Sequence, residues 1–416
     1  MDSNSRPALR AVESIVVPDK QHGRVLLLRD TQGVTDAHAV IPPALIPIVA
    51  RFTGRLTCTE IAAAVSRELG GEVPADVVVR LADELDRRLF LDGLTFREAK
   101  ARVEVEFGNA AVRAAAHAGG AYHGERQALA QYIEQSCLAK AGPRTTATSP
   151  SSGARMLGLV APHIDPWRGA VGYGHAYRAL QAALPAEAET FILFGTSHAP
   201  MRQPFALCRK AFATPLGTVE ADLSGIDALA RAAHGFDPYA DQMNHKREHS
   251  IEFQAVFLKH LLGPRPARII PVLAGLGAQQ ASGEDPADDA RVARFMDAVR
   301  GLVAEGAGRV VVVAGADLAH IGPRFGDGSP LDEAARTVLE ETDRASLDRA
   351  ASLDPRAFWD HVAADLDTRR VCGLAPIWSL LSSLGPAAQG RILHYEQTID
   401  RDDGSIVSHA AMGFYD

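Results

Sequence analysis

The chain has 416 residues, of which 47% are hydrophobic and 23% charged, so it can bury a large core and form one large domain beside a smaller one. Its formal net charge of -8 comes without a basic stripe, which argues against nucleic acid and anionic membranes as partners. No apolar stretch reaches the roughly 18 to 20 residues of a membrane span, and the first residues lack the apolar core of a signal peptide. A cytoplasmic location is therefore expected. The four cysteines form no CxxC pair, which argues against a zinc knuckle or a disulfide framework.

From residue 10 to 95 the sequence predicts a small α+β domain. Two short β-rich runs, 14–17 and 24–28, flank a polar turn and predict a hairpin. Three helices are expected after it: over 42–52, over 57–69 with Thr57 as the N-cap, and over 74–89. This order is typical of a winged-helix-like domain. The charged segment 96–111 is expected to be a helical connector.

Residues 112–416 are expected to form an α/β domain. Buried strands are predicted where short apolar runs occur, and helices where apolar residues recur at helical spacing. The strands are expected at 157–160, 191–194, 268–273 and 309–314, and the helices at 173–184, 250–262, 288–305 and 331–349. This alternation predicts a central, mostly parallel sheet flanked by helices. The Pro/Ser/Thr/Gly-rich segment 141–153 is expected to be a loop.

Two predicted strands end at a histidine. The run LGLVAP leads to His163, and FILFGTS leads to His198. In an open α/β sheet the carboxyl ends of the strands border the ligand-binding crevice. Neutral imidazole is a common ligand of iron, copper and zinc, so this pair suggests a metal site. The alternative is that each histidine only hydrogen-bonds at a strand end.

Cys372 is the candidate third ligand. It opens the run CGLAPI, whose glycine permits a close backbone approach. A thiolate would add the soft anionic ligand that two neutral histidines lack. A buried structural thiol is the alternative.

Three further residues are candidates for acid/base work. His249 lies in the first turn of a predicted helix, where the dipole favours neutral imidazole, although capping with its glutamate neighbours would also explain it. Asp317 and His320 share the predicted loop after the strand at 309–314, so the carboxylate could orient the imidazole. A helix-capping aspartate with an incidental histidine is the alternative.

Other catalytic signatures are absent from the sequence. It contains no GxSxG elbow and no GxxxxGK[ST] loop, and no GxGxxG stands between a strand and a helix. Serine hydrolase and nucleotide-phosphate binding therefore lack support.

Several short motifs occur in a fixed order: AAHAGGAY, APHIDP, GTSHAP, TPLG, EHSIEFQ, ADLAHIG and CGLAPI. Together they resemble the Memo family, which includes the AmmeMemoRadiSam system protein B. The resemblance implies a fold like that of class III extradiol dioxygenases. It also implies that His163, His198 and Cys372 bind iron, with copper as an alternative and zinc less favoured. His249, Asp317 and His320 would line the same pocket. Asp165 departs from the family pattern and puts the substrate pocket in doubt.

The N-terminal domain, residues 10–95, resembles a PqqD-like module, which holds a precursor peptide against its modifying enzyme. We therefore expect a non-haem iron oxidoreductase, O2-dependent, that acts on a small molecule or on a peptide presented by this module. A radical-SAM enzyme or a precursor peptide would be its partner. Two alternatives stay open: an adaptor that binds a metal or a peptide without catalysis, and a zinc-dependent hydrolase.

Overall fold

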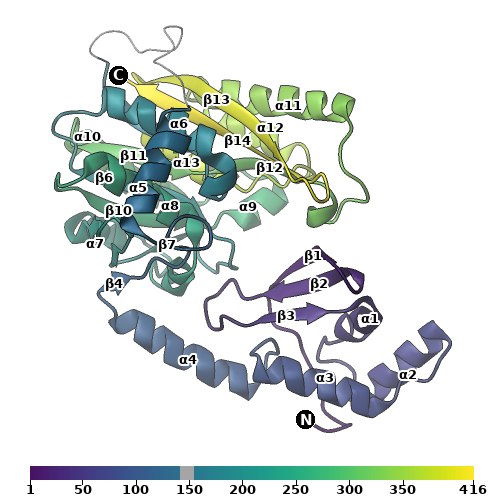
Figure 1. The fold of residues 1–416 in the computed structure, drawn as a ribbon. Coiled ribbons are helices and arrows are strands. Elements are labelled where there is room, and N and C mark those ends of the chain that lie inside the picture. Colours follow the sequence, from purple (N-terminus) through teal and green to yellow (C-terminus); the bar gives the residue numbers. More distant parts are fainter. Residues whose placement is uncertain (141–153) are drawn as a thin grey trace. The chain divides into compact units, whose positions relative to one another are not determined.

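The computed structural model describes residues 1–140 and 154–416, and the described chain divides into two compact units. Unit 1 is Met1–Ala110 and unit 2 is Ala111–Asp416 (Figure 1). The predicted loop at 141–153 lies outside the described residues. No helix in the described parts of the chain is both long enough and apolar enough to cross a bilayer.

Unit 1 contains the predicted hairpin, its helices and one additional strand. Its elements are β1 (Glu13–Asp19), β2 (Gly23–Arg29), β3 (His38–Ile41), a 3-10 turn (Pro43–Leu45), α1 (Ile46–Val49), α2 (Cys58–Leu69), α3 (Ala75–Arg87) and α4 (Leu94–Asn109). Thr57 caps α2 as predicted, in a reciprocal capping box with Glu60. The helix expected over 42–52 is instead two short pieces, because prolines interrupt it. The peptide-presenting role stays a prediction.

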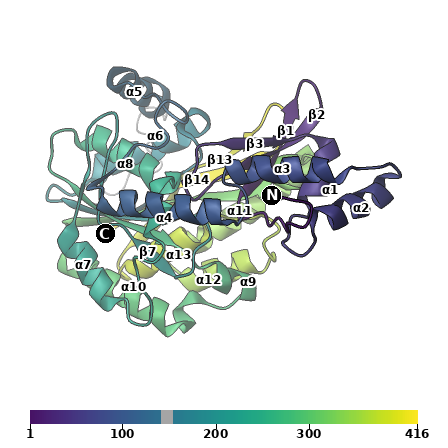
Figure 2. The ribbon, with the colours of Figure 1, turned by 90° about the horizontal axis from the view of Figure 1, so that it is seen from below.

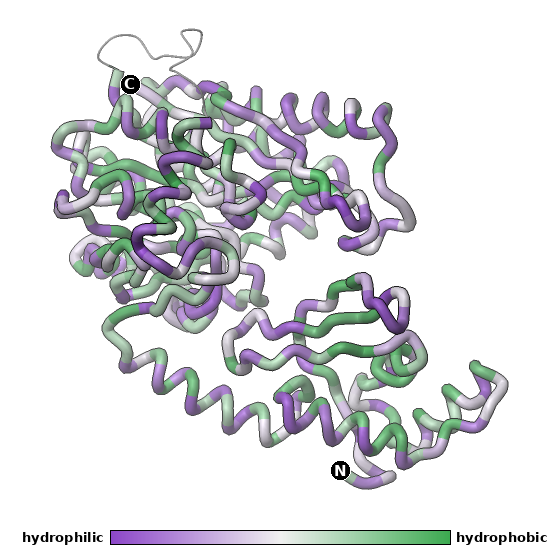
Figure 3. The backbone as a smooth tube through the Cα atoms, in the orientation of Figure 1, coloured by the Kyte–Doolittle hydropathy of each residue, from purple (hydrophilic) through white to green (hydrophobic). Residues whose placement is uncertain are grey.

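Unit 2 is built on a nine-stranded sheet with the order β12-β14-β5-β11-β6-β10-β7, with β13 paired to β14 and β9 to β10. The strands are β5 (Met156–Ala161), β6 (Thr190–Thr196), β7 (Phe205–Leu207), β9 (Glu220–Ala221), β10 (Arg268–Ala274), β11 (Val310–Gly315), β12 (Asp317–Ile321), β13 (Gln389–Ile399) and β14 (Ile406–Tyr415). A separate pair joins β4 (Val112–Arg113) to β8 (Ala211–Phe212). The four predicted strands β5, β11, β6 and β10 are adjacent and parallel. Figure 3 shows them as hydrophobic segments, as expected for strands buried on both faces.

Helices cover both faces of this sheet, so the predicted α/β class is confirmed. Figure 2 shows α5, α6 and α8 on one side and α10, α12 and α13 on the other. The helices of unit 2 are α5 (Arg126–Tyr132), a π-helical turn (Ile133–Leu138), α6 (Pro166–Ala183), α7 (Leu223–Ala232), α8 (His249–Leu262), α9 (Gly277–Ser282), α10 (Ala290–Glu305), α11 (Glu333–Ala351), α12 (Pro355–Ala363) and α13 (Leu374–Ser383). Short 3-10 turns occur at Gln242–Lys246, Pro286–Asp288 and Pro323–Phe325.

The sheet has antiparallel edges that the sequence pattern does not predict. The long hairpin of β13 and β14 follows α13, and β14 pairs antiparallel with β5. Every residue of β14 is buried, including Ser408 and His409. Polar residues inside a buried strand interrupt the apolar run by which such strands are recognised. The buried strand therefore escapes prediction.

Candidate metal centre

His163 follows β5 by two residues and is almost completely buried. Its Nδ1 lies 2.9 Å from the Gly315 carbonyl oxygen at the end of β11. Its backbone N–H donates to Oδ1 of Asp317 over 2.8 Å. Since Nδ1 donates to the carbonyl, Nε2 is the nitrogen that can bind a metal.

His198 follows β6 by two residues and is oriented by one carboxylate. Glu248 accepts from the backbone N–H of His198 over 2.8 Å, and both carboxylate oxygens lie 3.1 Å from Nδ1. The carboxylate is buried at the N-cap of α8. Because Nδ1 of His198 faces Glu248, Nε2 is the nitrogen that could bind a metal. A carboxylate paired with a histidine in this way is common at metal sites.

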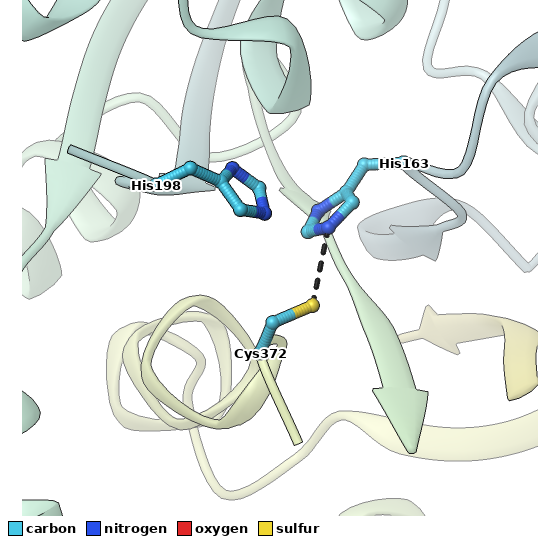
Figure 4. Close-up of side chains that lie close together, drawn as sticks. All are labelled: His163, His198 and Cys372. Carbon is cyan, nitrogen blue, oxygen red and sulfur yellow. Dashed lines mark hydrogen bonds between the residues drawn. The ribbon is translucent and has the colours of Figure 1, made fainter. Parts of the chain in front are cut away.

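Cys372 brings its sulfur to both histidines from the start of α13. Its Sγ lies 3.2 Å from Nε2 of His163, and the two imidazoles and the thiol point toward one another (Figure 4). One ligand atom from each of the three residues lies within 4.8 Å of the other two. Thr196 donates to the Cys372 carbonyl over 2.7 Å, which ties the cysteine to the end of β6.

The residue after the cysteine must be small. The Gly373 N–H donates to the Asp317 carbonyl oxygen over 2.9 Å. A Cβ at position 373 would overlap that oxygen. Glycine thus allows the cysteine backbone to lie against β12.

Groups of opposite charge lie side by side in this buried site. Burial alone would lower the pKa of His163, but the Cys372 thiolate and the Asp317 carboxylate outweigh it and raise this pKa to about 9. Burial would raise the pKa of Cys372, yet His163, His320 and the hydrogen bonds from His163 and His198 lower it to about 5. The pair is therefore a thiolate beside an imidazolium, and a cation that binds there would displace the proton.

His249 lies against both candidate ligand histidines, His163 and His198. Its ring stacks on His198 with centroids 4.5 Å apart and meets the edge of His163 at 5.3 Å. The helix begins at His249, as predicted. Burial, together with the neighbouring His198, holds the pKa of His249 well below its usual value, although Glu248 opposes this. The imidazole is therefore neutral, mainly because of burial.

Asp317 and His320 lie in β12, a short strand, and not in a loop as the sequence suggests. The Asp317 carboxylate contacts His163, through the backbone N–H and at 3.7 Å from Nε2. His320 turns Nδ1 toward the Leu318 carbonyl at 3.1 Å. The Asp317 carboxylate therefore holds the backbone of His163. Burial raises the pKa of this carboxyl, but it is outweighed by His163, His409 and His320, which lower it.

A cavity of about 630 Å³ reaches the site. His198 and Cys372 line it together with Thr196 and Ser197. Farther along, polar side chains line the wall: Arg202, Gln203, Gln279, Gln280, Arg291, Asp367 and Arg370. This volume is within the range of small-molecule pockets.

The family model for Memo-like protein matches residues 113–413. The chain belongs to the Memo family. A MEMO1 family protein of Aquifex aeolicus is 25% identical over 397 residues, covering 95% of this chain and 97% of that protein. A MEMO1 family protein of Methanosarcina acetivorans is 30% identical over 262 residues, covering 62% of this chain and 85% of that protein. A crystal structure of an uncharacterized Escherichia coli K12 protein covers 62% of this chain and 99% of its own, at 15% identity and a TM-score of 0.34. That structural likeness is too low to support an argument.

The Memo-family domain brings further polar residues close to the candidate site, and the sequence motifs assign them no such position. The sequence predicts Glu248 only as a capping partner of His249, but its carboxylate lies against the ring of His198. His117 brings its ring to 5.7 Å from that of His249. Buried Arg113 pairs with buried Glu252, whose carboxylate also accepts from the His117 N–H over 2.9 Å. A charged residue between Ile251 and Phe253, in an otherwise apolar stretch of α8, is the signal that could have indicated this pairing.

Two other polar residues of this Memo-family chain have structural roles. Asp165, the departure from the family pattern, caps α6 and pairs with Arg168. His245 is buried, with Nε2 3.0 Å from the Ala206 carbonyl oxygen.

Proposed function

We propose that this Memo-family protein is a mononuclear non-haem iron oxidoreductase that uses O2. One observation carries the proposal: two strand-end histidines and one distant cysteine bring three ligand atoms within 4.8 Å of one another. The substrate would be a small molecule that enters the cavity, or a peptide presented by unit 1.

The donor set fits a redox metal. Two imidazole nitrogens and one thiolate suit iron or copper, and three protein ligands leave coordination positions for other groups. Carbonyl and carboxylate partners fix the tautomer of each histidine, as at known metal sites. A bound Fe(II) would supply electron transfer to O2, which no protein side chain offers.

The remaining residues would position and shield this chemistry. Asp317 holds the His163 backbone, and Glu248 holds the His198 ring. His249 presents a buried imidazole beside both ligands, where it can hydrogen-bond a bound substrate and hold a proton. His320, half-buried near Cys372, is the second candidate for moving a proton.

Anaerobic reconstitution with Fe(II) tests the proposal before any substrate is known. We expect one iron per chain, and an iron–nitrosyl EPR signal with nitric oxide, which takes the place of O2 at open positions. Cys372→Ala should lose or strongly weaken the iron. Cys58→Ala is the matched control, because Cys58 is a buried thiol in unit 1.

The oxygen uptake of the iron-loaded protein is then measured with a panel of small molecules and peptides. This measurement distinguishes the oxidoreductase from the adaptor and the zinc-dependent hydrolase. Uptake that depends on Cys372 supports the oxidoreductase. Hydrolysis supported by Zn(II) without O2, or peptide binding that is indifferent to chelator and to His163→Ala, would overturn it.

A further inference from the structure

The segment before the cysteine ligand, residues 365–371, has an unusual backbone. Leu366, Asp367 and Arg370 have φ values of 53°, 63° and 50°. Side chains other than glycine rarely adopt this left-handed conformation, and it persists only where surrounding contacts impose it. Such contacts must therefore exist close to Cys372.

Arg369 supplies them from the middle of the segment. Its side chain is only 6% exposed, and Nη1 donates to Oδ1 of Asp343 over 2.8 Å. Its Nε donates to the Asp365 carboxylate, and this bond joins two residues of the same segment. Its carbonyl oxygen accepts from the His320 N–H over 2.7 Å, which joins the segment to β12.

Asp343 extends this network into the sheet. The carboxylate lies on α11 and is fully buried. Its other oxygen accepts from Ser408 of β14 over 2.6 Å and from Tyr395 of β13 over 3.0 Å. Ser408 also accepts from the Ala319 N–H of β12 over 2.9 Å. One guanidinium thus connects the segment to a helix and three strands.

We propose that Arg369 is a positioning residue for the metal centre. It holds residues 365–371 in the strained path that turns the Cys372 sulfur toward His163 and His198. Bonds from Thr196 and Gly373 fix the backbone on the far side of the cysteine. Cys372 is therefore held from both sides along the chain. Only the planar guanidinium of an arginine can bond both Asp343 and Asp365 from this position. This inference rests on the proposed function, because it assumes that Cys372 binds a metal.

Hydrogen exchange of the metal-free protein tests the positioning alone. Arg369→Lys keeps the positive charge but loses the planar guanidinium that bonds two carboxylates. Backbone amides in peptides covering 318–322 and 368–374 should therefore exchange faster in this variant. The matched control is Arg10→Lys, a buried arginine that pairs with Asp30 over 2.9 Å in unit 1. It should leave those peptides unchanged and speed exchange in unit 1. Unchanged exchange in folded Arg369→Lys would overturn the inference.

Co(II) titration provides the second readout. Wild type should show a thiolate-to-Co(II) charge-transfer band, and Arg369→Lys should bind Co(II) about tenfold or more weakly with an altered band. Arg10→Lys should match wild type. If Arg369→Lys does not fold, Tyr395→Phe removes one hydrogen bond to Asp343 and should change the band in the same direction. A band unaltered in the folded variants contradicts the inference, whereas a missing band in wild type contradicts the proposed function instead.

Discussion

At the scale of single residues, Glu248 illustrates how one carboxylate can organise a ligand. It contacts the backbone and the ring of His198 and also accepts from the Ser250 N–H over 2.9 Å. The nearby His198 imidazole holds the pKa of Glu248 well below its usual value, despite the opposing effect of burial. A buried anion that is satisfied in this way keeps the imidazole in one orientation.

Replacing Glu248 with Gln should weaken metal binding by about 10- to 100-fold, because the amide keeps the shape and loses the charge that orients His198. Isothermal titration with Fe(II) or Co(II) measures the change. Glu252→Gln, one turn along the same helix, should reduce stability but leave the affinity of the folded protein near that of wild type. Equal affinity in wild type and Glu248→Gln would contradict this role.

His245 gives a prediction for pH. Burial lowers the pKa of His245 to about 4, below the ordinary value near 6.5, so the folded state prefers the neutral form. The stability that depends on neutral His245 is fully present above pH 6.5. It is lost as the pH falls toward 4, by up to about 3 kcal/mol. The free energy of unfolding, measured with denaturant, should therefore change less between pH 4 and 6.5 in His245→Gln than in wild type. The difference in slope should correspond to at most about one bound proton. Identical slopes would show that His245 does not titrate in this way.

At the scale of elements, the site depends on how closely α8 packs against the carboxyl ends of β6 and β11. A Cβ at Gly195 or Gly315 would overlap atoms of the first turn of α8. Gln254, on the same helix, donates to the Pro162 carbonyl over 2.9 Å, just before His163. The N-terminal part of α8 thus helps to position both candidate ligand histidines.

Gly315→Ala should destabilise the protein by about 1–3 kcal/mol, because the added methyl group pushes against the backbone of α8. It should also weaken metal binding, since α8 carries Glu248. Gly301→Ala is the matched control: open space surrounds this position in α10, so alanine should be neutral or slightly stabilising. Thermal unfolding and Co(II) titration would check both. Equal effects of the two variants would argue against the packing role.

The sequence predicts the elements whose pattern is local. The strands β5, β6, β10 and β11 are each recognisable from a short apolar run in the sequence. Both candidate ligand histidines follow such runs. Cys372 reaches the two histidines because the chain returns to them just before α13. The spacing of these residues in the sequence does not reveal this return. Glu248 contacts His198 across 50 residues of the chain, and Arg369 contacts Asp343 across 26 residues. Only the fold brings these residues together.

At the scale of the whole molecule, the two units have separate hydrophobic cores. The core of unit 1 centres on residues such as Ile61, Val65 and Leu85, and that of unit 2 on the central sheet and its helices. Each core is therefore expected to unfold with its own cooperativity.

Ile61→Ala removes a fully buried side chain and should destabilise unit 1 by about 2–5 kcal/mol. Calorimetry should show that unit 1 unfolds at a lower temperature than in wild type. Co(II) titration should show an unchanged metal affinity. A parallel loss of metal affinity would mean that the centre depends on unit 1.

The account depends on a single ion bound by His163, His198 and Cys372. X-ray absorption at the iron edge of the Fe(II)-reconstituted protein tests this most directly. We predict one sulfur and at least two nitrogen ligands around the iron, with the sulfur absent in Cys372→Ala. A spectrum of wild type without sulfur, or one that Cys372→Ala leaves unchanged, would contradict the account.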